Sequence, residues 1–254
     1  MAQLFVTDFD GVICDSVSEC LLAADNAWRK FQKGENSQRI FDIHEIPEDR
    51  RSRFRQLRPY LRGAEDFIPL YLAAEESLKI ESQGEFDALR NRLLGELPAY
   101  QQAFYGERDF LRQHHRELWL QLNPLFSNVG RALGLRESFE EVYILTTKRR
   151  PDVEDIFKYH GIRFPADHIH AVASNGKMER LRSIMETACV SPAGTVYIED
   201  QIDYLISAAP MGVEVYLAEW GYVSDEQRRV SEEKQIPVLS QGKFGELLQN
   251  ALKR

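Results

Sequence analysis

Two aspartates near the start of the sequence have the residue type and spacing for phosphoryl transfer. In FVTDFDGVICDS, Asp8 ends an apolar run, Asp10 follows two residues later, and Gly11 comes next. An ionised carboxylate at Asp8 can attack phosphorus and form an acyl phosphate. Asp10 can lie on the same side of the turn, protonate the leaving oxygen and then activate water. The alternative is ordinary turn chemistry after a strand.

A phosphate that approaches Asp8 needs a cation, because two negative charges repel each other. The segment YIEDQID offers acids for such an ion at Glu199, Asp200 and Asp203. Hard oxygen ligands grouped at a strand end suit Mg²⁺, although acids there also stabilise the N-terminus of a following helix. A calcium EF-hand is excluded at the first pair, since Val12 occupies the third alternating ligand position.

Two further segments carry groups that can contact a phosphoryl oxygen. ILTTK ends in Thr146, Thr147 and Lys148, and Lys177 opens a helix after SNG. A strand-end hydroxyl can donate to phosphate, and Lys177 can neutralise both the nucleophile and the transferring group. Taken alone, Thr146 is also at home in a strand, and a helix lysine is commonly solvated. We predict Thr146 and Lys177 as catalytic residues, with Gly11, Thr147 and Lys148 as substrate contacts.

These residues need a scaffold, and the sequence alternates strands with helices after residue 123. Buried or alternating apolar segments predict strands at residues 3–8, 141–147, 168–174, 194–200 and 213–221. Strands separated by helices of this length indicate βαβ units and a parallel sheet. The predicted fold class is therefore α/β, with a Rossmann-like doubly wound parallel sheet as its core.

Residues 16–122 have a different pattern of apolar residues, with helical periodicity and no convincing strand. The predicted last helix of this segment is a long one over 103–122. The segment leaves from the carboxyl end of the first strand, where open α/β sheets bind ligands. We therefore predict an inserted all-helical cap domain at 16–122, and a core domain formed by 1–15 and 123–254.

Two cap arginines, Arg58 and Arg62, are candidate substrate contacts beside Pro59 and Gly63. Guanidinium forks suit phosphate and carboxylate. Surface arginines on a helix are the simpler alternative.

Composition narrows the class of protein. The chain has 254 residues, 43% apolar and 28% charged, which predicts a packed core. Its net charge of −8 argues against nucleic acid as the main partner, and no apolar run is long enough to span a membrane. Three scattered cysteines suit neither a disulfide framework nor a zinc site, so we expect a reducing, cytoplasmic compartment. A first strand from Gln3 leaves no room for a signal peptide ahead of it.

The motifs DFDGV, ILTTK, Lys177 and YIED together resemble the haloacid dehalogenase superfamily of aspartate-nucleophile phosphohydrolases. The resemblance covers the whole chain and puts residues 16–122 in the position of the helical cap. The chain is also similar to a narrower branch associated with photosynthetic organisms. The segments that carry this second similarity are RFRQLRPYLRGAEDFIPLYLAAE, FYGERDF, IEDQIDYL and YLAEWGYVSDEQRR.

The superfamily resemblance assigns roles to the matching residues. It implies Asp8 as the nucleophile and Asp10 as the general acid and base. It further implies Thr146 and Lys177 as phosphate contacts. The ion it implies is Mg²⁺, held by Asp8, the backbone carbonyl of Asp10, and Asp200.

The fourth motif departs from the common pattern of the superfamily, in which glycine precedes the first aspartate and another acid lies four residues after it. Here Glu199 precedes Asp200, and Asp203 lies three residues after it. We favour Asp200 as a metal ligand, with either Glu199 or Asp203 as the second acid. The predicted cap is also longer than the commoner small helical caps, so the substrates of better-known members do not transfer.

The predicted function is that of a Mg²⁺-dependent phosphohydrolase acting on a small phosphorylated metabolite through a phospho-aspartyl intermediate. One alternative is a phosphomutase with the same chemistry, in which a closed cap excludes water. Another is a weakly active binding or regulatory protein that keeps the fold. Asp10 disfavours a true dehalogenase, because a halide needs no acid to leave. The sequence leaves the substrate and the oligomeric state open.

Overall fold

The protein divides into two compact units. The structure is a computed structural model, and it describes residues 4–34 and 37–251. One unit comprises Met1–Asp15 and Pro124–Arg254, and the other comprises Ser16–Asn123. We call them the core unit and the helical unit. The predicted start of the first strand, Gln3, lies outside the described residues, and the role of the helical unit as a cap stays a prediction.

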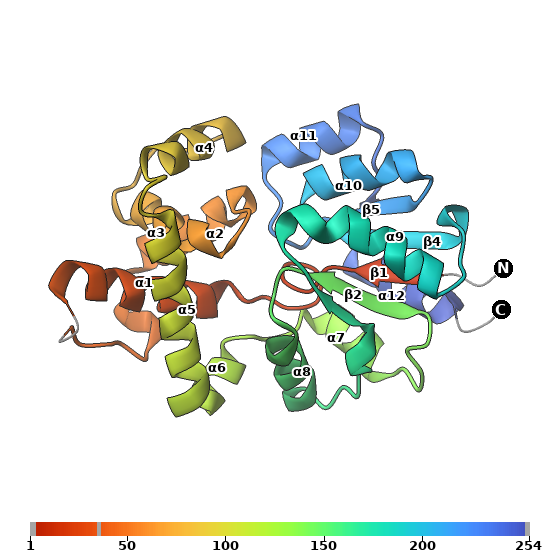
Figure 1. The fold of residues 1–254 in the computed structure, drawn as a ribbon, viewed down its shortest axis with the longest axis horizontal. Helices are drawn as coiled ribbons and strands as arrows, with labels where there is room; N and C mark the ends of the chain where they lie inside the picture. The colour runs from red at the N-terminus through yellow and green to blue at the C-terminus, as the bar shows by residue number, and fades with distance from the viewer. Residues whose placement is uncertain (1–3, 35–36, 252–254) are drawn as a thin grey trace. The chain divides into compact units, whose positions relative to one another are not determined.

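A six-stranded parallel sheet in the order β3-β2-β1-β4-β5-β6 forms the centre of the core unit (Figure 1). Its strands are β1 (Leu4–Thr7), β2 (Val142–Thr146), β3 (Ile169–Ala171), β4 (Thr195–Glu199), β5 (Glu214–Ala218) and β6 (Val238–Leu239). In the register, Val6 of β1 lies beside Tyr143 of β2 and Tyr197 of β4. The chain order reverses between β1 and β4, which is where open α/β sheets bind ligands.

The predicted α/β fold class with a doubly wound parallel sheet is confirmed. The sequence analysis missed β6, because a strand of two residues after Pro237 shows no alternation that could be recognised. Ser224 and Gln227 form a capping box at the start of α11. The other five predicted strands all occur, and within the described residues each is shorter than predicted.

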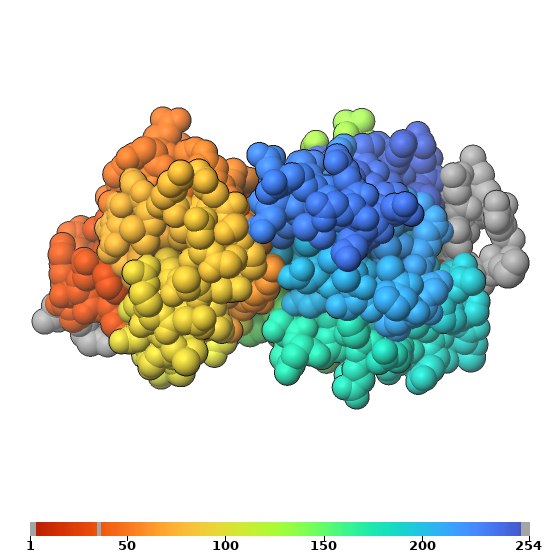
Figure 2. All heavy atoms as spheres, turned by 90° about the horizontal axis from the view of Figure 1, so that it is seen from above, coloured from red at the N-terminus to blue at the C-terminus, as the bar shows by residue number. Residues whose placement is uncertain are grey.

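Helices pack on both faces of the sheet, with α9 and α10 on one side and α7 and α12 on the other (Figure 1). Figure 2 shows α11, α10 and α9 side by side on one surface of the core unit. The helices of this unit are α7 (Ser127–Gly134), α8 (Arg150–Tyr159), α9 (Lys177–Thr187), α10 (Ile202–Ala208), α11 (Asp225–Glu233) and α12 (Gln241–Ala251).

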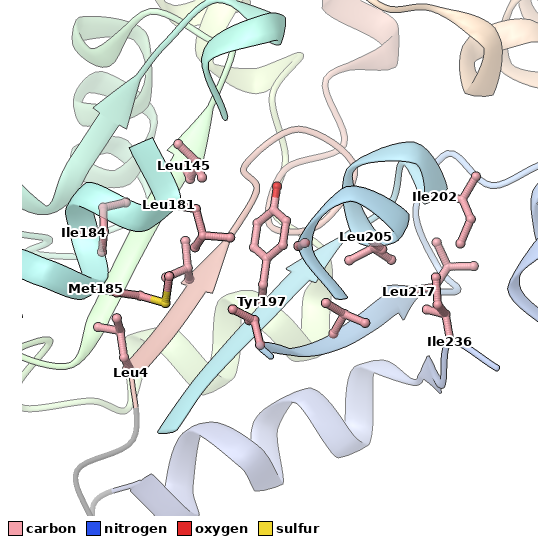
Figure 3. Close-up of a cluster of buried hydrophobic side chains, with 14 residues drawn as sticks. Leu4, Leu145, Leu181, Ile184, Met185, Tyr197, Ile202, Leu205, Leu217 and Ile236 are labelled. Carbon is pink, nitrogen blue, oxygen red and sulfur yellow. The ribbon is translucent and has the colours of Figure 1, made fainter. Parts of the chain in front are cut away.

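An apolar cluster lies between the sheet and the helices α9 and α10 (Figure 3). Leu4, Leu181 and Leu205 are among its fully buried members. Tyr197 has its ring in this cluster at 0% exposure and is its one buried member with a hydroxyl group. A buried tyrosine hydroxyl requires a hydrogen-bond partner, and this one finds it at the end of β4, as described below.

The described part of the helical unit contains helices and no strand, as the sequence predicted. Its helices are α1 (Val17–Lys33), α2 (Glu48–Leu57), α3 (Phe67–Glu75), α4 (Gln83–Arg92), α5 (Leu97–His114) and α6 (Arg116–Gln121). The single long helix predicted over 103–122 is wrong. The backbone of His115 has φ −136° and ψ 47°, which is not helical, so α5 ends and α6 begins there. Across the described residues, no helix is both long and apolar enough to cross a membrane.

Buried ion pairs join the helices of this unit. Arg108 of α5 donates to both carboxylate oxygens of Glu19 of α1, at 2.8 Å each, and both side chains are almost fully buried. Arg39, in the segment that follows α1, makes a partly exposed two-point contact with the buried Glu107 of α5, at 2.6 and 3.0 Å. Removing one charge of a buried pair leaves the other uncompensated, which costs more than the pair itself contributes.

We therefore expect Glu19→Gln to lower the free energy of unfolding by about 3–5 kcal/mol, because Arg108 then stays buried without its counter-charge. Urea unfolding followed by circular dichroism measures this. Glu81→Gln is the matched control, since Glu81 faces Lys79 at 3.6 Å in an exposed pair, and it should cost less than about 1 kcal/mol. Equal effects of the two substitutions would contradict the importance of the buried pair.

Candidate active site

The strand order brings three carboxylates to one edge of the sheet. Asp8 follows β1, Glu199 ends β4, and the backbone N–H of Asp8 donates to the carbonyl of Ile198 at 3.0 Å. One carboxylate oxygen from each of Asp8, Glu199 and Asp200 lies within 4.8 Å of the others, and all three residues are buried. Asp203 is not part of this group. Among the described residues, this is therefore the arrangement that can hold a metal ion.

Lys177 supplies the positive charge of this cluster. Its Nζ lies 3.2 Å from Asp8 Oδ2 and 2.8 Å from Glu199 Oε2, and its side chain is 2% exposed. The Nζ also lies 4.4 Å from the centre of the Tyr204 ring. Burial lowers the pKa of Lys177, but the charges of Asp8 and Glu199 outweigh it and hold this pKa above its ordinary value. The amine is therefore a permanent cation.

The carboxylates are under-compensated by this one lysine. Burial, with a smaller contribution from Glu199, raises the pKa of Asp8 to about 7, and the charge of Lys177 only partly opposes the rise. Burial also raises the pKa of Glu199. Within the described residues, Asp8 Oδ1 and Glu199 Oε1 are buried without a hydrogen-bond partner. Two such oxygens near a third carboxylate fit a hard divalent cation, which prefers oxygen ligands.

A second lysine is paired with the second aspartate. The Nζ of Lys148 lies 3.2 Å from Asp10 Oδ1, and its side chain is fully buried. The backbone N–H of Lys148 donates to Thr146 Oγ1 at 3.1 Å. The turn after β2 therefore holds the predicted phosphate contact Thr146 and the partner of Asp10 together. Thr147, a predicted substrate contact, is exposed at the same strand end.

Two glycines allow Asp200 to approach the loop that carries the aspartates. A Cβ on Gly11, which has φ +86°, would lie 2.0 Å from Asp200 Oδ2. A Cβ on Gly221 would lie 2.4 Å from the carbonyl oxygen of Gly11. Asp200 Oδ2 accepts a hydrogen bond from the backbone N–H of Tyr222 at 2.9 Å. The backbone of Tyr222 therefore holds Asp200 against the loop that carries the two aspartates.

Trp220 and Tyr222 also brace the loop directly. Trp220 Nε1 donates to the carbonyl of Val12 at 2.9 Å, and the Tyr222 hydroxyl bonds Asp15 Oδ1 at 3.0 Å. Trp220 and Tyr222 follow β5 in the sequence, where an aromatic residue can equally line the mouth of a site or pack against its neighbours. The spacing of these two residues does not predict a contact with residues some 200 positions earlier, so the contact is seen only in the structure.

Tyr197 is the site residue that sequence reasoning did not find. Its hydroxyl donates to Glu199 Oε2 at 2.7 Å. The signal was present, because residues two apart on a strand point to the same face, and Tyr197 and Glu199 both belong to β4. It was missed because the alternation was used only to assign the strand.

Arg58 and Arg62 make their described contacts inside the helical unit. Arg58 is buried, with its guanidinium carbon 5.4 Å from the centre of the Phe67 ring. The backbone N–H of Arg62 donates to Asp66 Oδ2 at 3.0 Å. Their role as substrate contacts stays a prediction.

Comparison with solved structures identifies the fold of the chain. No protein-family model and no curated protein sequence matches the chain. A predicted phosphatase from Clostridium acetobutylicum is 13% identical with a TM-score of 0.58, covering 100% of both chains. A predicted phosphoglycolate phosphatase from Haemophilus somnus is 15% identical with a TM-score of 0.59, covering 96% of this chain and 97% of its own. The chain has the haloacid dehalogenase-like fold.

A third structure of this fold carries ligands. It is a haloacid dehalogenase family hydrolase from Deinococcus radiodurans with bound phosphate and sodium, and it is 15% identical with a TM-score of 0.55. It covers 98% of this chain and 96% of its own. Likeness at such low identity establishes the fold, and the chemistry of this haloacid dehalogenase-like chain has to be argued from its own residues.

The raised pKa of Asp8 predicts a pH-dependent stability in metal-free protein. A carboxyl whose pKa rises from 3.8 to about 7 on folding binds its proton more tightly in the folded state. The contribution of this bound proton to the free energy of unfolding is full below pH 4 and is lost as the pH rises to about 7. Asp8→Asn lacks this titration. Unfolding in chelator should therefore give a wild-type stability, relative to Asp8→Asn, that is higher at pH 5 than at pH 8. A constant difference would contradict the pKa of Asp8.

Proposed function

We propose that the protein is a Mg²⁺-dependent phosphohydrolase that acts on a small phosphorylated metabolite through a phospho-aspartyl intermediate. The observation that carries the proposal is the position of the buried carboxylate of Asp8. It lies 3.2 Å from Lys177 Nζ, and one of its oxygens lies within 4.8 Å of an oxygen of Glu199 and one of Asp200. The predicted phosphatase and the phosphate-bound hydrolase among the structures of similar fold support the same chemistry. The alternatives from the sequence, a phosphomutase and a weakly active binding protein, are outcomes of the experiments below.

Asp8, Asp200 and Glu199 would hold the ion, together with the backbone carbonyl of Asp10. When bound, Mg²⁺ offsets the charge of the phosphate and polarises its oxygens. The ammonium of Lys177 lies against the same carboxylates, so it can attract a phosphoryl oxygen next to the nucleophile. The hydroxyl of Thr146 can donate to a second oxygen.

The reaction then has two steps. An oxygen of Asp8 bonds to phosphorus while the bond to the leaving oxygen breaks, and the carboxylic acid of Asp10 gives that oxygen its proton. In the second step Asp10, now a carboxylate, takes a proton from water as the water oxygen bonds to phosphorus. The bond to Asp8 breaks, inorganic phosphate leaves, and both aspartates return to their starting states. Lys148 holds Asp10 in position for both transfers.

We also propose a cytoplasmic protein with no nucleic-acid partner, as the charge and cysteine content suggest. The similarity to a branch from photosynthetic organisms stays a proposal of the same kind.

The chemistry predicts slow hydrolysis of an aryl phosphate such as p-nitrophenyl phosphate, and only with Mg²⁺. Asp8→Asn should abolish turnover because it removes the nucleophile. Asp10→Asn should lower kcat by roughly 10²–10⁴-fold, because it removes only proton transfer. Release of the chromophore measures both effects, and rapid quench with mass spectrometry locates a covalent phosphate on Asp8.

Full activity in excess chelator would contradict the metal requirement, and full activity of Asp8→Asn would refute the mechanism. Isomerisation of an added sugar bisphosphate, without release of phosphate, would identify a phosphomutase. Binding of phosphorylated compounds with no turnover of any of them would identify a binding protein.

The helical unit offers cationic groups for the rest of a substrate. It contains a cavity of about 350 Å³ in which Arg51 and Arg55 of α2 meet an apolar wall that includes Leu21. His44 lies in the same cavity, with its Nδ1 2.8 Å from a guanidinium nitrogen of Arg51. Together with Arg62, these residues are candidates for recognising an anionic leaving group.

We expect Arg55→Ala and Arg62→Ala to change the relative kcat/KM among phosphorylated metabolites, because they alter recognition of the leaving group. Lys177→Ala should instead depress every substrate together, by roughly 10²–10³-fold, because it removes charge at the phosphoryl group itself. A panel of phosphorylated metabolites run on all three variants measures this. Uniform losses in the two arginine variants would mean that these residues play no part in selectivity.

A further inference from the structure

We infer that Tyr197 is a positioning residue for Glu199, and that this hydrogen bond makes Glu199 the acid that joins Asp8 and Asp200 around the ion. The inference deepens the proposed function and rests on it, since it concerns the metal of the same site. It also chooses between the two acids, Glu199 and Asp203, that the sequence left open.

The two oxygens of Glu199 have different surroundings. Oε2 accepts from the Tyr197 hydroxyl at 2.7 Å and from Lys177 Nζ at 2.8 Å. Oε1 is buried and, in the described structure, has no hydrogen-bond partner. Two donors on one oxygen fix the plane of the carboxylate, so the other oxygen is held in one direction. A buried carboxylate oxygen without a donor is costly, and a metal ion removes that cost.

Lys177 cannot fix Glu199 alone. Its ammonium is shared with Asp8 Oδ2 at 3.2 Å, and a lysine is a flexible chain that carries a point charge. Tyr197 is the rigid partner, because its ring is held at 0% exposure in the apolar cluster of Figure 3. Tyr197 and Glu199 lie two residues apart on β4, and so on the same face of the strand. The position of the hydroxyl is therefore set by the packing of the core.

Asp203 lies apart from this group of carboxylates. It lies in the first turn of α10 and does not belong to the group of carboxylates that approach one another within 4.8 Å. The three members of that group come from the ends of β1 and β4, which are adjacent in the sheet. Outer partners that orient a metal ligand typically raise metal affinity by 10–100-fold. The Tyr197 hydroxyl has the geometry of such a partner.

The test is metal affinity measured without substrate. Mn²⁺ also prefers oxygen ligands, and its binding can be followed through loss of the free ion's electron paramagnetic resonance signal, with Mg²⁺ as competitor. Tyr197→Phe keeps the ring and removes only the hydroxyl. We expect it to weaken Mn²⁺ binding by roughly 10–100-fold, while thermal unfolding in chelator shows a folded protein.

The matched control is Tyr216→Phe on the adjacent strand β5. Tyr216 also donates to a glutamate two residues away, Glu214, but this pair is exposed and is not part of the carboxylate group. Its loss should leave Mn²⁺ affinity unchanged. In a Glu199→Gln background, Tyr197→Phe should have little further effect, because the hydroxyl acts through the Glu199 carboxylate.

The outcomes separate the inference from the proposed function. If the wild type binds Mn²⁺ and Tyr197→Phe binds it equally well, the inference is overturned and the phosphohydrolase proposal stands. Equal losses from Tyr197→Phe in the wild-type and Glu199→Gln backgrounds would also overturn it, because the effect would then not pass through Glu199. If the wild type binds neither Mn²⁺ nor Mg²⁺, the metal requirement of the proposed function fails, and the inference fails with it.

Discussion

The excess of negative charge at the carboxyl edge of the sheet governs the rest of the site. Three buried carboxylates, those of Asp8, Glu199 and Asp200, meet one buried ammonium, that of Lys177. Charges taken out of water are stable only with partners, and one lysine cannot compensate three acids. Burial, with a smaller contribution from the charge of Glu199, raises the pKa of Asp8, and Lys177 only partly opposes the rise. The cluster therefore has the charge and the oxygen atoms to receive a cation, and the proposed phosphohydrolase chemistry rests on that property.

The surrounding structure keeps these acids together against their repulsion. Gly11 and Gly221 remove the two side-chain atoms that would collide with Asp200 or with the loop beside it. The backbone of Tyr222 holds Asp200, and the side chains of Trp220 and Tyr222 hold the loop from Val12 to Asp15. The side-chain contacts of Trp220 and Tyr222 join segments 208 and 207 residues apart, so the site forms only when both ends of the core unit have come together. These hydrogen bonds constrain the loop between Val12 and Asp15, and constrained groups suit catalysis by preorganised charges.

Sequence reasoning predicted the parts of the protein that leave a periodic or local signal. Strand and helix periodicity in the sequence predicted five strands and the helices of residues 16–122. It also placed acids at the ends of two strands. The break at His115 could not, because neither glycine nor proline marks it. The pairing of Lys148 with Asp10 could not either, since it depends on how two strand ends face each other. Local sequence patterns thus predict the fold. Which charged side chains pair with each other depends on the order of the strands in the sheet.

The two lysines show what this topology adds to the chemistry. Lys177 contacts Asp8, the proposed nucleophile, and Glu199, whereas Lys148 contacts Asp10. The carboxylate that would bond to phosphorus and the one that would move a proton therefore have separate cations. Asp8 and Asp10 lie only two positions apart in the chain, yet they have different partners. Lys148, the partner of Asp10, follows β2, whereas Lys177 and Glu199, which lie beside Asp8, belong to α9 and β4. Two similar carboxylates can take different roles because the sheet surrounds each with different charges.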